Sequence, residues 1–163
     1  MKYNLMHREV IPGDLAIICN FPQNENELFY MFPKAVFPLT VDQLKSSVDN
    51  RFDSTVVTVE NDVAGFANFY EVKTHQYCSI GNVIVNPKYR GKGIATFLIN
   101  VMENKAITKY KAKEVHISCF NLNIAGLLLY SKLGYIPYNI EKINAPNSQP
   151  VALIKMKKEV KKI

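Results

Sequence analysis

Segment 83–95 constrains the fold more than any other part of the chain, because it joins two elements of different periodicity through a short loop. It reads Val-Ile-Val-Asn-Pro-Lys-Tyr-Arg-Gly-Lys-Gly-Ile-Ala: an apolar β-branched run, then a basic loop with two glycines. Beyond the loop, apolar residues recur at helical spacing, namely Ile94, Phe97, Leu98, Val101 and Met102. A strand that leads directly into such a helix predicts an α/β or α+β domain.

Residues on both sides of this segment extend the pattern into a mixed sheet. Strands are expected at 3–10, 55–60, 63–72, 77–85, 115–120, 135–138 and 151–156, and helices at 12–19, 41–48, from residue 94, and at 124–133. The short turns at 61–62 and 73–76 predict an antiparallel meander from 55 to 85. Segment 21–37, in which prolines interrupt many aromatic residues, is expected to be loosely structured.

Composition narrows the class of protein. The 163 residues, 48% hydrophobic and 21% charged, fit one packed domain and exclude a disordered or fibrous chain. Cys19, Cys78 and Cys119 form no CxxC pair, so neither a disulfide framework nor a zinc site is indicated. No apolar run approaches the length of a membrane span and the first residues do not resemble a leader, so a cytoplasmic protein without a membrane partner is expected.

The net charge of +6 is concentrated near the C-terminus. Segment 155–163 holds five lysines against one glutamate and therefore contributes most of that charge. We expect it to be a solvated, frayed, lysine-rich tail. A basic nucleic-acid-binding domain is a possible interpretation of the charge, but basic and aromatic residues do not alternate along any one strand as an RNA platform requires.

The basic loop predicts a phosphate-binding site. Gly91 and Gly93 remove side chains where the free N–H groups of the following helix point outward, so phosphate oxygens can approach the backbone. Lys88 and Arg90 add positive charge nearby. The loop is neither a P-loop, since GxxxxGK is absent, nor a dinucleotide fingerprint, since Thr96 stands where a third glycine is needed. A diphosphate ligand is indicated.

Two motifs in this order resemble the GNAT superfamily, the acyl-CoA-dependent N-acyltransferases. Segment 90–95, Arg-Gly-Lys-Gly-Ile-Ala, matches the signature Arg/Gln-x-x-Gly-x-Gly/Ala, and segment 123–135 resembles Asn-x-x-Ala-x-x-Leu-Tyr-x-Lys-x-Gly-Phe. The likeness covers about 56–138 and fades over 1–50, where the family varies with its acceptor. It implies one N-acetyltransferase domain over 1–163, with a mixed, mostly antiparallel sheet flanked by helices and splayed between its fourth and fifth strands.

The resemblance also implies which residues bind acetyl-CoA. Backbone amides of the loop would cradle the pyrophosphate, Lys88 and Lys92 would serve the adenosine phosphates, and the fourth strand would pair with the pantetheine arm and hold the thioester oxygen. The cofactor-binding residues expected on this basis are Val83, Ile84, Val85, Arg90, Gly91, Lys92, Gly93, Ile94, Ala95, Thr96 and Asn123. Asn123 either contacts the pantetheine or caps the following helix. No metal is expected.

Catalysis is expected to rest on one tyrosine. Tyr130 matches the family's tyrosine that protonates the departing CoA thiolate. The sequence departs from the family pattern at Gly126, where alanine is commoner, and strand 77–85 has no acidic residue to act as the base. Glu71, Glu27, His116 or a water remain candidates. A neutral amine attacking the thioester directly needs proximity more than a strong base.

Three functional hypotheses remain open, and the first is an N-acetyltransferase that acts on a small primary amine or a peptide N-terminus. In it the aromatic segment 21–37 forms the acceptor wall, and Glu25 and Glu27 attract a cationic amine. The second is a non-catalytic acyl-CoA-binding regulatory domain, which the presence of Tyr130 disfavours; the third is the nucleic-acid-binding domain. An acyl-enzyme on Cys119 is disfavoured because buried cysteines in apolar strands are usually inert. Exposed strand edges would permit a homodimer.

Overall fold

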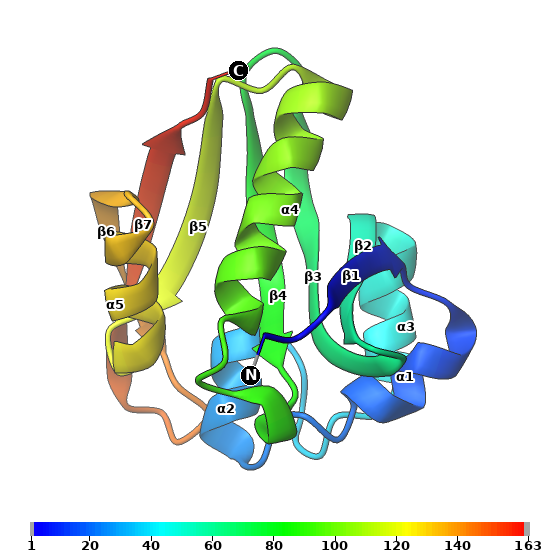
Figure 1. Cartoon of the computed structure of the whole chain (residues 1–163). Coiled ribbons are helices and arrows are strands. Elements are labelled where there is room, and N and C mark those ends of the chain that lie inside the picture. Colours follow the sequence, from blue (N-terminus) through cyan, green and yellow to red (C-terminus); the bar gives the residue numbers. More distant parts are fainter. Residues whose placement is uncertain (1, 162–163) are drawn as a thin grey trace.

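A computed structural model, which describes residues 2–161, contains one seven-stranded sheet with helices on both faces (Figure 1). The sheet order is β1-β2-β3-β4-β5-β7-β6. The strands are β1 (Leu5–Glu9), β2 (Phe52–Val59), β3 (Asp62–Lys73), β4 (Tyr77–Val85), β5 (Glu114–Phe120), β6 (Ile136–Asn144) and β7 (Pro150–Glu159). All neighbours are antiparallel except β4 and β5, which are parallel, and this confirms the predicted mixed, mostly antiparallel sheet.

The sheet splays between β4 and β5, as expected. The two strands pair only over four positions, from Tyr77 with Glu114 to Ile80 with Ile117. Beyond Ile80 a bulge disturbs the pairing of β4 with β3, and Asn82 adopts a left-handed φ of 53°. The buried Asn82 amide stabilises this bulge, because it accepts hydrogen bonds from Ser47 (2.5 Å) and Asn68 (3.0 Å) and donates to the Met31 carbonyl (3.1 Å).

The helices are α1 (Pro12–Ile18), α2 (Glu25–Met31), α3 (Val41–Asn50), α4 (Ile94–Tyr110) and α5 (Ile124–Lys132), with a 3₁₀ turn at Pro87–Tyr89. The expectation that segment 21–37 is loosely structured is wrong, because it contains α2. The Asn24 side chain caps this helix by accepting the Glu27 N–H (2.9 Å), and Leu28 and Met31 are buried. Its flanking prolines lie outside the helix and bound it.

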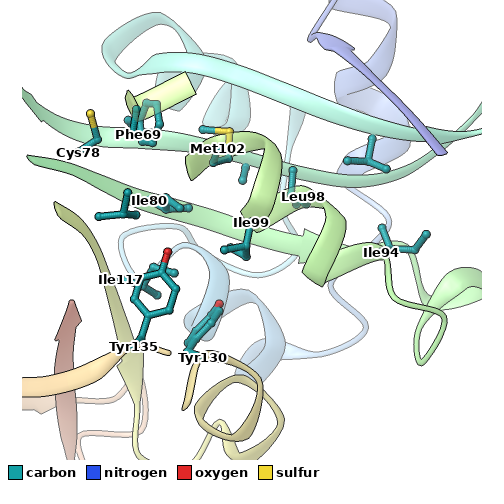
Figure 2. Close-up of a cluster of buried hydrophobic side chains, with 14 of the residues drawn as sticks. Phe69, Cys78, Ile80, Ile94, Leu98, Ile99, Met102, Ile117, Tyr130 and Tyr135 are labelled. Atoms are coloured by element: carbon teal, nitrogen blue, oxygen red, sulfur yellow. The ribbon is translucent and has the colours of Figure 1, made fainter. Parts of the chain in front are cut away.

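Alternating side chains of the strands face two separate cores. Val57, Phe69 and Ile80 face α4 and α5, where they pack with α4 residues such as Leu98 and Met102 (Figure 2). Val56, Phe66 and Ile84 face the opposite side, where they pack with α1, α2 and α3. The sheet therefore separates α4 and α5 from the N-terminal helices, and the splay between β4 and β5 is a gap in that separation.

Residues 155–159 of the lysine-rich segment 155–163 form the last half of β7 and not a frayed tail, while residues 162–163 lie outside the described residues. Ile154 and Met156 point into the core, so the segment has the period of a half-buried strand. Three lysines of the segment pair with carboxylates on neighbouring elements: Lys155 with Glu141 (2.7 Å), Lys157 with Glu114 (3.3 Å) and Lys158 with Glu103 (3.0 Å). The run of lysines concealed the alternation of apolar and polar residues that indicates a strand.

Candidate functional site

A cavity of about 570 Å³ lies where β4 leaves β5. Its walls come from the second half of β4, the loop after it, the start of α4, α5 and one side of α2. All twelve predicted site residues line it except Lys92. Tyr30 and Met31 also line it and belong to segment 21–37, which was expected to form the acceptor wall, but the sequence did not predict the helix α2 that positions them. The two sequence motifs and the N-terminal region thus meet around one cavity.

The loop before α4 presents a row of backbone N–H groups to this cavity. Gly91 and Gly93 have φ values of 72° and 81°, in the region that side chains rarely adopt, so a side chain at either position would strain the backbone. Gly93 is the N-cap of α4 and no side chain caps the helix. The hydrogen bonds within residues 2–161 include none donated by the backbone amides of 91–96. This end of a 17-residue helix suits phosphate oxygens.

Arg90 ties this loop to α2. Its guanidinium forms an ion pair with Glu27 (2.6 Å) and donates to the carbonyls of Phe21 (3.2 Å) and Val85 (3.3 Å). The Glu27 carboxylate is therefore already paired with a cation at the cavity wall, which weakens its case as a general base or as an attractant for an amine.

The two lysines of the loop differ in their partners. Lys88 pairs with Asp62 (2.8 Å), and its hydrogen bonds to Asp62 and Tyr89 raise the pKa of its ammonium. Lys92 donates to the Lys88 carbonyl (3.2 Å) and lies against the Tyr3 and Tyr89 rings. Both remain exposed beside the loop, where cations raise the local positive potential.

Tyr130 is a largely buried side chain whose hydroxyl lies at the cavity wall. Its side chain comes from α5 and is 6% exposed, and burial, followed by the nearby Cys119, raises the pKa of the phenol. Within residues 2–161 its hydroxyl makes no hydrogen bond, whereas the neighbouring Tyr135 hydroxyl donates to Glu103 (2.8 Å). Figure 2 shows both rings beneath α4. Tyr130 is thus a protonated phenol that is free to donate into the cavity.

Asn123 caps α5, since its side-chain oxygen accepts the Gly126 N–H (3.1 Å). The same packing explains the glycine at 126. A Cβ there would lie 2.7 Å from the Asn123 amide nitrogen and 3.0 Å from the Cys119 sulfur. Burial raises the pKa of the Cys119 thiol to about 12, so at neutral pH it is neither a thiolate nor a nucleophile.

The other candidate bases lie outside the cavity. Glu71 accepts a hydrogen bond from Tyr77, at the end of β4 that remains paired with β5. His116 pairs with Glu114 (2.8 Å) and stacks on Tyr77 with ring centroids 4.2 Å apart. Neither residue lines the cavity. This arrangement favours a route in which water takes the proton.

Two features are absent from residues 2–161. His, Cys, Asp and Glu side chains nowhere gather in a group of three that could hold a metal ion. None of the helices combines the length and the apolar character that crossing a membrane requires.

Comparison with known proteins agrees with this geometry. A profile of the acetyltransferase (GNAT) family matches residues 21–135, more than half of the chain. No curated protein matches the sequence significantly. Solved structures similar to the chain include spermidine N-acetyltransferase from Vibrio cholerae in complex with CoA and spermine, with 23% identity, 95% of each chain covered and a TM-score of 0.78.

Two further similar structures come from other bacteria. The ribosomal-protein-S18-alanine N-acetyltransferase from Escherichia coli is 18% identical, with 98% of this chain and 96% of that chain covered and a TM-score of 0.75. A putative acetyltransferase from Salmonella typhimurium, with its cofactor acetyl-CoA, is 16% identical, with 98% and 95% covered and a TM-score of 0.74. At these identities the three structures establish a shared fold.

Proposed function

Because the chain belongs to the acetyltransferase (GNAT) family, we propose that it transfers the acetyl group of acetyl-CoA to a primary amine, on a small molecule or at a peptide N-terminus. The observation that carries the proposal is that one cavity joins an anion-binding helix end to the Tyr130 hydroxyl, which has no hydrogen-bond partner within residues 2–161. The helix end suits the pyrophosphate of acetyl-CoA, and the Tyr130 hydroxyl suits its leaving sulfur. Acetyl-CoA supplies an activated acetyl group as a thioester.

The residues of the chain would bind and orient the two substrates. The amides of 91–96 bind the pyrophosphate, and the part of β4 beyond Ile80, which β5 does not pair, offers backbone groups to the pantetheine arm. A backbone N–H of β4 stabilises the negative charge that develops on the thioester oxygen, because a fixed donor needs no reorganisation. The acceptor amine and the thioester then meet in the splay between β4 and β5, where their proximity accounts for much of the rate acceleration.

The proposed transfer is a direct attack in a ternary complex. The amine lone pair forms a C–N bond with the acetyl carbon and the C–S bond breaks. The amine nitrogen loses a proton to water, and the sulfur takes a proton from Tyr130, which water then restores. Burial raises the pKa of the phenol, but the same surroundings raise the pKa of a thiol, as Cys119 illustrates, so the transfer remains feasible.

The second hypothesis, a regulatory domain that binds acyl-CoA without turnover, has less support. A domain that only binds the cofactor has no need of a tyrosine hydroxyl that faces the cavity without a hydrogen-bond partner among residues 2–161. Tyr130 therefore favours catalysis. Saturable binding of acetyl-CoA without turnover of any amine would favour regulation.

The proposed function is tested by the release of CoA from acetyl-CoA with a panel of primary amines: amino acids, peptides with free N-termini, polyamines and aminoglycosides. We expect turnover with one class of amine and none without an acceptor. A blank without acceptor is needed because Cys19, which is partly exposed, can react with a thiol reagent. Binding of acetyl-CoA with no release of CoA across the panel would contradict the proposal.

Replacing Asn123 by alanine separates its two predicted roles. Loss of the α5 cap should lower the free energy of unfolding by about 1 kcal/mol, and Thr40→Ala, which removes the cap of α3, should do the same. If Asn123 also contacts the pantetheine, only Asn123→Ala raises the KM for acetyl-CoA, by several-fold. Thermal unfolding and steady-state kinetics of both variants measure this. An unchanged KM would restrict Asn123 to capping.

A further inference from the structure

Arg51 differs from the other arginines of the chain in having no carboxylate partner. The chain has three arginines; Arg8 pairs with Asp14 (2.7 Å) and Arg90 with Glu27 (2.6 Å). Among residues 2–161, Arg51 forms no ion pair. Its one protein hydrogen bond is donated to the Asn68 side-chain oxygen (3.2 Å), which leaves most of its N–H groups available.

The guanidinium is held in place and is only partly accessible. It lies 5.7 Å from the ring centroids of both Phe32 and Tyr70, and its burial lowers the pKa of Arg51. The two rings fix its position, and solvent hydrates it incompletely. A partly desolvated cation of this kind gains most from a ligand that brings the opposite charge.

Glycine at position 81 lets Arg51 lie directly on the backbone of β4. A Cβ there would come within 2.7 Å of the Arg51 terminal nitrogen and 2.8 Å of the Tyr70 ring. Gly81 directly follows Ile80, the last residue of β4 that pairs with β5. The guanidinium therefore lies at the point where the splay begins.

Tyr70 shows on which side of the sheet this group lies. Its neighbour Phe69 packs against α4, so Tyr70 points to the opposite face, the face that carries α2 and α3. From β3 its hydroxyl reaches Ser118 of β5 (3.5 Å), beyond the last paired residue of that strand. Arg51 and Tyr70 thus flank the splay on the side opposite α4, where an acceptor amine can approach without crossing the loop before α4.

On this geometry we propose that Arg51 binds an oxyanion of the acceptor, so that the acceptor is an amine that also carries a carboxylate or phosphate group. The inference rests on the proposed function. A planar guanidinium matches both groups through paired N–H donors. The C-terminal ends of α2 and α3 lie near Arg51, and their partial negative charge would attract a cationic acceptor. A helix end carries only about half an elementary charge, however, which is less than the full positive charge of Arg51. An anionic acceptor fits better than a polyamine.

Paired substrates test the proposal. Amino acids and dipeptides are compared with their carboxamides, and O-phosphoethanolamine with ethanolamine, by kcat/KM at saturating acetyl-CoA. We expect the wild-type protein to prefer one kind of anionic acceptor over its neutral partner by about 10-fold or more. A preference among the carboxylates identifies an amino acid or peptide, and one for O-phosphoethanolamine identifies a phosphorylated amine. Equal rates on acids and amides, or turnover of polyamines alone, would overturn the proposal.

Substitution of Arg51 assigns the preference to this residue. Arg51→Gln should lower kcat/KM for the anionic acceptor by about 10- to 100-fold, leave the neutral partner within about 2-fold and leave the KM for acetyl-CoA unchanged. Arg51→Lys should retain part of the preference. Lys45→Gln, an exposed lysine of α3, removes the same charge and should change nothing. A uniform loss on all amines in both Arg51 variants would make the residue purely structural and contradict the proposal.

A binding experiment separates failure of this inference from failure of the proposed function. Saturation-transfer NMR of the CoA-bound protein is recorded with a mixture of N-acetyl amino acids, N-acetyl amino amides and N-acetylphosphoethanolamine. Transfer to the anionic members that is lost in Arg51→Gln supports the Arg51 site even if no amine is turned over. Equal transfer to anionic and neutral members, or none to either, would count against it whatever the kinetics.

Discussion

The substitution Gly93→Asp should abolish measurable binding of acetyl-CoA, with a rise in Kd on the order of 100-fold or more. Gly93 has a φ of 81° and caps α4 next to the row of free amides, and a side chain there would meet open space. A carboxylate at this position would place negative charge where the pyrophosphate is expected to bind. It would also impose backbone strain of about 1 to 2 kcal/mol. Calorimetric titration with acetyl-CoA measures the change.

Two further variants separate charge from strain. Gly93→Ala imposes the strain without the charge and should weaken binding much less than Gly93→Asp. Gly13→Asp places a carboxylate at another open glycine near a helix start, in α1, and should leave the Kd unchanged. An unaltered Kd in folded Gly93→Asp would show that the pyrophosphate does not bind at this helix end.

The elements that could be predicted from the sequence are those in which one segment is long enough, or bounded clearly enough, to show the period of its apolar residues. Strand β4 has the predicted bounds, 77–85, because a turn precedes it and Asn86-Pro87 ends it. Helix α2 lacked such a signal, since its seven residues give too little periodicity to detect. Its cap, Asn24, would have been the one local indication.

The parts of the site that lie within one segment could also be predicted, whereas those that depend on distant contacts could not. The glycines of the loop and Tyr130 belong to local motifs, so their types and spacing were informative. The pair of Arg90 with Glu27 joins residues 63 positions apart, and nothing near either residue indicates the other. Gly81 did carry a signal, since a glycine inside a strand often marks the close approach of another group.

The substitution Tyr130→Phe should lower kcat by about 100-fold, while the KM and Kd for acetyl-CoA stay within about 2-fold. The hydroxyl is the only group removed. In the proposed mechanism it acts on the sulfur only as the C–S bond breaks, so its loss affects the transition state and not the binding of the cofactor. Steady-state kinetics with the acceptor found in the amine panel measure both constants.

Tyr135→Phe is the matched control, because its ring lies 6.2 Å from that of Tyr130 and its side chain is also buried. That hydroxyl donates to Glu103, so its loss should lower the free energy of unfolding by about 1 to 3 kcal/mol and leave kcat unchanged. Equal kcat values for Tyr130→Phe and the wild-type protein would reduce Tyr130 to a packing residue.

The pH dependence gives a second test of the same acid. Burial raises the pKa of Tyr130 above the ordinary value for a phenol, so the acid should stay protonated throughout the range in which the amine loses its proton. The wild-type kcat/KM for the amine should therefore rise with pH to a plateau, without a descending limb below about pH 10. A descending limb near neutrality would assign the proton to a different group, because a phenol with a raised pKa cannot ionise there.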